Sequence, residues 1–171
     1  MKKNITGYAD WKEGAEHIEW ECSEEDVILT DVEEIQHTCE KEVLLYKLAE
    51  KEGVEHFFTK LEHIGNNIYK QAVANTIKGS FDLSDELREH EQGFEEKCKS
   101  LGLDELLKRS DSVSTYAFIK EYPIDDLLKL QAFLVKYNVT DLVQRNVGWV
   151  NGVLQIFDYD FNDAKEEDLN A

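Results

Sequence analysis

Residues 141–158 are the most informative stretch of this chain, and they read DLVQRNVGWVNGVLQIFD. Two apolar runs in this stretch are separated by an Asn-Gly pair at 151–152, which favours the two-residue turn of a β-hairpin. Three polar residues surround the predicted hairpin: Asp141 and Asn146 precede its first strand, and Asp158 follows its second. We take these three as the strongest candidate functional residues in the chain.

Helices are predicted on the N-terminal side of this stretch. Residues 124–137 follow the only proline of the chain and carry apolar side chains at three- and four-residue steps, which is typical of a helix with one buried face. Residues 82–109 read as a more polar helical segment, with Ser84 as its N-cap and two glycines that interrupt it. Residues 109–114 read as a loop.

The first half of the chain combines short strands with one long helix. Alternating and apolar runs predict strands within residues 16–29, and an apolar stripe predicts a helix from about residue 31 or 32 to residue 51. A Gly-Asn-Asn turn within residues 61–73 predicts a second hairpin. These patterns divide the chain into a flexible leader (1–12), a sheet with one helix (13–78), a reduced helical part (79–161) and an acidic tail that we expect to be frayed (162–171).

The order of these elements resembles a protein-kinase-like fold reduced to a small size. In kinases an apolar helix leads to a catalytic loop, where an Asp is followed by Leu and, five positions after the Asp, by Asn; a hairpin then leads to a second Asp. Asp141, Leu142, Asn146 and Asp158 stand at these positions. The resemblance runs from about residue 14 to 161 and is specific only from residue 141 onward. The chain is similar to the short kinase-like proteins of bacteria and their phages. It implies an α+β, two-lobed fold with a small N-terminal antiparallel sheet and one helix, followed by a reduced helical part with a β-hairpin.

The resemblance also implies a role for each of the three polar residues. Asp141 would be the catalytic residue that orients an acceptor hydroxyl and takes its proton, while Asn146 and Asp158 would hold Mg²⁺ against the phosphates of ATP. Phosphoryl transfer needs such ligands because negative charge develops on the phosphate oxygens. ATP and Mg²⁺ are therefore the expected cofactors, and a chain that binds neither is the alternative.

The nucleotide-binding half departs from the kinase pattern. Gly14 stands alone between acidic residues where kinases have a glycine-rich loop, and Thr30 stands where the resemblance would place the phosphate-binding Lys. Glu42, with Glu40, is the candidate for the helix Glu that pairs with that Lys, although on so acidic a helix we expect each to face solvent. Eleven residues follow Asp160, fewer than the peptide-binding helices of kinases need. We therefore expect a pseudokinase or binding module with weak or no phosphoryl transfer, and whether the chain is an enzyme stays open.

The formal charge of -18 leads to a second hypothesis. It argues against direct binding to nucleic acid or to an anionic membrane, because both require clustered Lys and Arg. An acidic surface suits a basic protein partner, as in inhibitors that imitate DNA and block restriction enzymes; the simpler reading is that the acids keep the protein soluble. A second copy of the chain is a further candidate partner. No apolar segment has membrane-spanning length, and the N-terminus lacks a signal core, so we expect a cytoplasmic protein.

Overall fold

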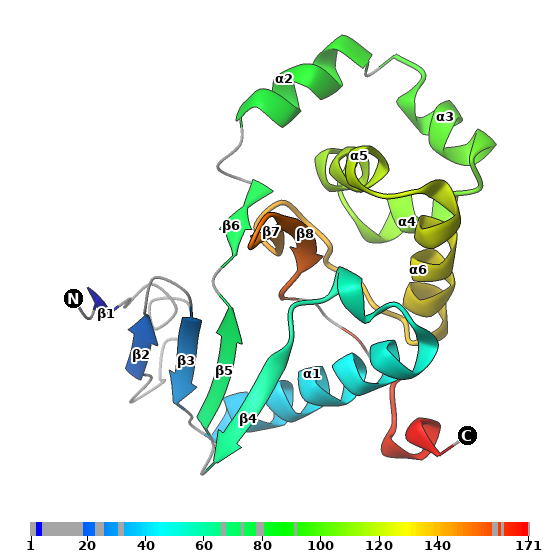
Figure 1. Ribbon diagram of the computed structural model, residues 1–171. Coiled ribbons are helices and arrows are strands. Elements are labelled where there is room, and N and C mark those ends of the chain that lie inside the picture. The colour runs from blue at the N-terminus through cyan, green and yellow to red at the C-terminus, as the bar shows by residue number, and fades with distance from the viewer. Residues whose placement is uncertain are drawn as a thin grey trace.

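The computed structural model describes residues 3–4, 19–22, 26–30, 33–65, 68–72, 74–77, 81–90, 92–158, 161 and 163–170. Within these residues the fold is mixed α+β, with six α-helices and two small antiparallel sheets. The five-stranded sheet lies on one side of the molecule and the three-stranded sheet lies between it and most of the helices (Figure 1). The prediction of an α+β fold is confirmed.

The larger sheet is built by the first half of the chain. Its strands, in sequence order, are β1 (Lys3–Asn4), β2 (Glu19–Cys22), β3 (Asp26–Thr30), β4 (Leu61–Gly65) and β5 (Ile68–Ala72). Their order across the sheet is β1-β2-β3-β5-β4, and every neighbouring pair is antiparallel. The strands predicted within residues 16–29 and the hairpin predicted within residues 61–73 are therefore confirmed.

The long helix α1 (Glu33–Glu52) connects β3 to β4 and confirms the helix predicted from about residue 31 to 51. It ends at Gly53, whose φ of 72° is left-handed, a conformation that glycine adopts without steric cost. The short 3₁₀ helix η2 (Glu55–Phe57) follows at once and turns the chain back against α1. Leu45, Leu48 and Ala49 are fully buried on the inner face of α1.

Five further helices form the second half of the fold. They are α2 (Phe81–His90), α3 (Phe94–Ser100), α4 (Asp104–Arg109), α5 (Ser112–Glu121) and α6 (Ile124–Lys136). Gly93 and Gly102 separate α2, α3 and α4, as predicted, and both have positive φ. Two predictions are wrong. Ser84 lies inside α2 and is not its N-cap, because the helix begins three residues earlier. The loop predicted at 109–114 contains the start of α5, because the Asp111 side chain accepts a hydrogen bond from Ser114 N and caps that helix.

The second sheet contains the hairpin that the sequence predicts. Strands β7 (Val147–Val150) and β8 (Val153–Ile156) pair in antiparallel register around Asn151 and Gly152, both of which have positive φ. Strand β6 (Asn75–Thr76) adds a third strand beside β7. Its backbone comes so close to Gly148 that a Cβ there would lie 2.5 Å from Asn75 O, which explains the glycine in this strand.

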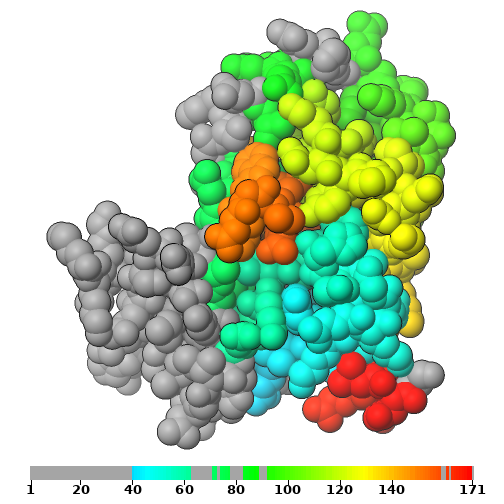
Figure 2. Space-filling view, viewed as in Figure 1, coloured from blue at the N-terminus to red at the C-terminus, as the bar shows by residue number. Residues whose placement is uncertain are grey.

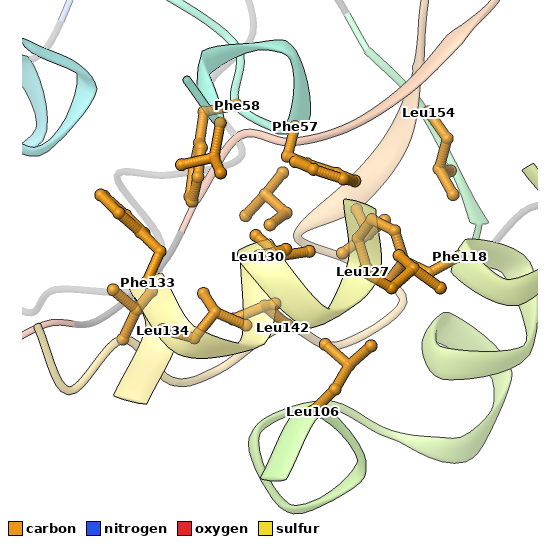
Figure 3. Packing of buried hydrophobic residues seen from close by; sticks show 14 of the residues in the cluster. Phe57, Phe58, Leu106, Phe118, Leu127, Leu130, Phe133, Leu134, Leu142 and Leu154 are labelled. Atoms are coloured by element: carbon orange, nitrogen blue, oxygen red, sulfur yellow. The ribbon is translucent and has the colours of Figure 1, made fainter. Parts of the chain in front are cut away.

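The hydrophobic core is centred on α6. Leu127, Leu130, Phe133 and Leu134 are buried along one face of this helix, as its apolar spacing predicts. Side chains from η2, α4, α5, β8 and the loop after α6 pack around them (Figure 3). The core therefore joins the segment that follows α1 to the helical half of the chain and to the hairpin.

The end of the described chain packs against α1. The 3₁₀ helix η4 (Glu166–Leu169) lies beside the C-terminal end of α1 (Figure 1). Lys51 Nζ donates to Asp168 O at 2.8 Å and to Leu169 O at 3.3 Å, and Leu169 is partly buried against the core. These contacts place Asp168 and Leu169 against the end of α1, and the fraying expected of residues 162–171 stays a prediction.

Candidate functional site

The loop between α6 and β7 carries two of the three predicted residues. Its apolar residues Val139 and Leu142, together with Val147 at the start of β7, are fully buried, while the polar residues between them face outward or bond within the loop. This alternation anchors the loop to the core on both sides of Asp141. Arg109 supports the same loop, because its Nη1 donates to Val139 O at 3.1 Å and to Asn138 Oδ1 at 3.3 Å.

Asn146 joins the two ends of this loop. It is 3% exposed, and its Nδ2 donates to the backbone oxygen of Asp141 at 2.9 Å and to Asp141 Oδ2 at 2.8 Å. A buried amide normally needs such partners, because an unpaired polar group loses the hydrogen bonds that it makes with water. The structure thus brings Asp141 and Asn146 into direct contact, with the Asn146 Nδ2 atom committed to Asp141.

Asp141 has an unusual backbone conformation. Its φ of 64° is left-handed, a region that non-glycine residues rarely occupy and in which Asp is one of the better tolerated types. Its backbone oxygen also accepts a hydrogen bond from Val143 N at 2.8 Å. Its carboxylate receives Arg145 Nη2 at 3.1 Å in addition to Asn146 Nδ2. The Asp141 side chain is therefore held in place by one buried amide and one exposed guanidinium.

Asp158 is placed near this loop by the hairpin. The backbone nitrogen of Phe157 donates to Asn146 O at 3.0 Å, so the residue before Asp158 is paired directly with Asn146. Gln71 Nε2 from β5 holds the same segment from the other side, donating to Phe157 O at 3.2 Å. Asp158 is half-buried. The register of the hairpin thus brings the third predicted residue to the same end of the sheet as Asn146.

Glu42 faces Asp158 from α1. Thr59 N donates to Ile156 O at 2.8 Å, which ties β8 to the chain that follows α1 and brings the end of the hairpin toward this helix. Burial raises the pKa of the Glu42 carboxyl well above its usual value, and the negative charge of Asp158 raises that pKa further. The expectation that Glu42 faces solvent is wrong, because the side chain lies on the inner face of α1 and is 9% exposed. Glu40, two residues earlier, is exposed as expected.

The remaining predicted residues are less completely described. Thr30 is the last residue of β3 and is paired through its backbone with Glu19 and Ile68. Gly14 lies outside the residues that the structure describes. The structure therefore places Asp141 and Asn146 in direct contact and pairs the residue before Asp158 with Asn146. It brings Glu42 within electrostatic reach of Asp158, and it places the backbone of Thr30 on the strand next to β5.

Two basic residues at this site were not predicted from the sequence. Arg145 contacts the Asp141 carboxylate, and Arg109 binds the backbone of the loop. Arg145 lies within the motif itself and could have been proposed from its position between Asp141 and Asn146. Arg109 could not, because it is thirty residues away in sequence from the oxygen that it contacts.

In Figure 2 the hairpin, in orange, lies at the surface between the cyan residues of α1 and η2 and the yellow-green residues of α5.

No group of three or more His, Cys, Asp or Glu side chains is arranged to hold a metal ion within the described part of the chain. No helix in that part has the length and apolar character needed to cross a membrane. Comparisons of the chain with protein-family models, with curated proteins and with solved structures found no match.

Proposed function

We propose that the chain is a degenerate kinase-like protein that binds a nucleoside triphosphate with Mg²⁺ and acts as a binding module with weak or no phosphoryl transfer. One observation carries this proposal: Asn146 bonds to Asp141 at one end of the hairpin, the residue before Asp158 bonds to Asn146, and Glu42 on α1 lies within electrostatic reach of Asp158. The order of elements supports it as well, since a strand-helix-hairpin unit precedes an apolar helix, a polar loop and a second hairpin.

Carboxylate and amide oxygens, such as those of Asp158 and Asn146, are of the type that binds Mg²⁺ together with phosphates. Mg²⁺ in proteins is commonly held by one or two carboxylates and completed by water and substrate phosphate oxygens, so a cluster of three acidic side chains is not required. Asn146 and Asp158 would hold the ion, which would neutralise charge on the phosphates when bound. Glu42 lies nearby as a carboxyl whose pKa is raised first by burial and then by the charge of Asp158, so a cation bound at Asp158 would lower that pKa.

Two features favour weak transfer over an active enzyme. The Asp141 carboxylate, which would have to accept the proton of an acceptor hydroxyl, already receives Arg145 and Asn146. Thr30 stands where the kinase resemblance places a Lys, and loss of one such transition-state contact lowers rates by about a hundredfold to a thousandfold. Glu42 would retain the position of the helix Glu without that cation. The site would thus keep its metal ligands and lack its phosphate-binding Lys.

The proposal is tested by thermal unfolding with ATP and Mg²⁺. We expect the two together to raise the melting temperature of the parent chain, because a ligand that binds the native state stabilises it. Asp158→Ala should abolish the shift. Asp163→Ala is the matched control, because Asp163 is an exposed aspartate outside the site, and this variant should keep the shift.

Two results would contradict the proposal. The first is the absence of any shift in the parent chain at millimolar ATP and Mg²⁺. The second is an equal shift in Asp158→Ala and the parent. The first result, combined with salt-sensitive binding to a basic protein, would favour the alternative function as an acidic interaction or inhibitor protein.

A further inference from the structure

Residues 109–111 run alongside the loop that carries Asp141 and Asn146. Leu142 N donates to Arg109 O at 3.1 Å, and Ser110 and Leu142 form an isolated parallel β-bridge. This contact joins the end of α4 to the middle of the loop, across more than thirty residues of sequence. Arg109, Ser110 and Asp111 therefore support the loop from the end of α4.

Asp111 uses its two carboxylate oxygens for two different purposes. Asp111 Oδ1 accepts Ser114 N at 2.8 Å and caps α5, while Asp111 Oδ2 accepts Gln144 N at 2.8 Å. Hydrogen bonds to a carboxylate are stronger than those between neutral groups, and the N-terminal end of a helix favours a negative charge. One half-buried side chain thus connects the start of α5 to the backbone between Asp141 and Asn146.

We propose that Asp111 is the positioning residue of the candidate site and fixes the conformation of residues 141–146. Gln144 lies in the turn that Asn146 closes by bonding to Asp141, so holding Gln144 N restrains the turn from outside. Without this bond the loop would keep its buried anchors Val139 and Leu142, and the turn between Leu142 and Asn146 would lose its external support. The consequence for nucleotide binding rests on the function proposed above, whereas the restraint on the loop does not.

The test uses variants that keep the cap of α5 and remove the second contact. In Asp111→Asn only one side-chain oxygen remains, so Ser114 N and Gln144 N cannot each keep an oxygen of their own. Asn is a favourable N-cap, and we therefore expect the remaining oxygen to stay on Ser114 N. In Asp111→Ser a short hydroxyl can cap the helix but cannot also reach Gln144 N. Asp111→Ala removes both contacts and is the comparison for loss of the cap.

The measurements are amide hydrogen exchange at Gln144 and Ser114 and the NMR resonances of the Asn146 side-chain amide. In the Asn and Ser variants we expect exchange at Gln144 to become about tenfold faster, exchange at Ser114 to stay near the parent rate, and the Asn146 amide resonances to shift. If the parent binds ATP and Mg²⁺, the affinity of both variants should fall by about tenfold. Unchanged Gln144 exchange together with unchanged Asn146 resonances would overturn the proposal.

Two other outcomes distinguish the positioning role of Asp111 from the proposed binding of ATP and Mg²⁺. A parent chain that does not bind ATP and Mg²⁺ refutes the proposed function, and the exchange and resonance data still decide the role of Asp111. A parent that binds, with variants whose loop signals change and whose affinity does not, overturns the positioning role and leaves the proposed function standing. Val54→Ala, a buried substitution between α1 and η2, controls for a general loss of stability, because it should lower the melting temperature without altering the Gln144 signal.

Discussion

Asn146 and Glu42 are both buried polar side chains at the candidate site, and their surroundings differ. Asn146 donates both hydrogen bonds of its amide nitrogen to Asp141. Glu42 is a carboxyl whose pKa is raised by burial and by the charge of Asp158. The loop side of the site is therefore held by its own hydrogen bonds, whereas on the α1 side ionisation of a buried carboxyl is opposed by burial and a neighbouring charge.

The two sides of the site therefore contribute to stability in different ways. A satisfied buried amide adds stability and specifies one loop conformation. A buried carboxyl beside a second acid opposes the folded state when both are charged, and it is the kind of arrangement that a bound cation relieves. The Asn146 side supports the fold through its own hydrogen bonds, and under the proposed function a bound cation would act on the charges of the Glu42 side.

The largest change in the free energy of unfolding should come from Asn146→Ala, which removes the hydrogen bonds on the loop side of the site. The substitution removes two hydrogen bonds and leaves the Asp141 oxygens without the buried donor that now satisfies them, so we expect the free energy of unfolding to fall by about 1–3 kcal/mol. Urea unfolding measures this value. Gln155→Ala is the matched control, because Gln155 also makes two side-chain hydrogen bonds, at 3.3 and 3.2 Å, but is only half-buried. An equal loss in both variants would contradict the special role of Asn146.

The next effect, of opposite sign, should come from Glu42→Gln. The folded-state pKa of Glu42 lies above the unfolded value near 4.5, so the native state holds the proton more tightly, and the parent loses stability as the pH rises from that value through the folded-state pKa. Replacement by Gln removes this loss. The variant should become increasingly more stable than the parent as the pH rises, by at most about 1.4 kcal/mol per pH unit for one proton.

Urea unfolding of parent and variant at a series of pH values from 4.5 upward measures the difference. Glu40→Gln is the control, because Glu40 is exposed on the same helix and its replacement should leave the pH dependence nearly unchanged. A constant difference between Glu42→Gln and the parent at all pH values would show that Glu42 does not titrate differently in the folded state.

The smallest effect should come from Arg145→Gln. This variant removes the exposed partner of the Asp141 carboxylate and leaves its buried partner Asn146 in place. Arg145 and Asn146 contact the same carboxylate, but the Arg145 side chain is 65% exposed. Exposed ion pairs contribute about 0–1 kcal/mol, and salt screens them. We expect urea unfolding of this variant to differ from the parent by less than 1 kcal/mol, roughly the upper limit for such pairs, and the difference to shrink at high salt. A loss as large as that of Asn146→Ala would show that the Arg145 contact is part of the loop structure.

Much of the fold was predictable from local patterns. The apolar spacing of residues 124–137 indicated α6, and the Asn-Gly pair indicated the β7–β8 hairpin. The helix α5 was missed, because its sequence is rich in Ser, Thr and Val, which are weaker helix formers, and its apolar positions do not form a regular stripe. The Asp111 N-cap with Ser114 three residues later was the signal that could have found it.

Local sequence patterns were enough to predict the α+β class, the position of the hairpin and the candidate residues Asp141, Asn146 and Asp158, because turn residues and hydrophobic periodicity act over short distances along the chain. The burial of Glu42 near Asp158, and the support that Arg109 and Asp111 give to the loop of Asp141, became known only from the three-dimensional packing. These contacts join segments that are thirty or more residues apart, and nothing in the local pattern of either segment encodes its partner. Burial and charge at the site arise from how α1, α4 and α5 pack around the loop and the hairpin, and the physical character of the site therefore depends on packing more than on the motif.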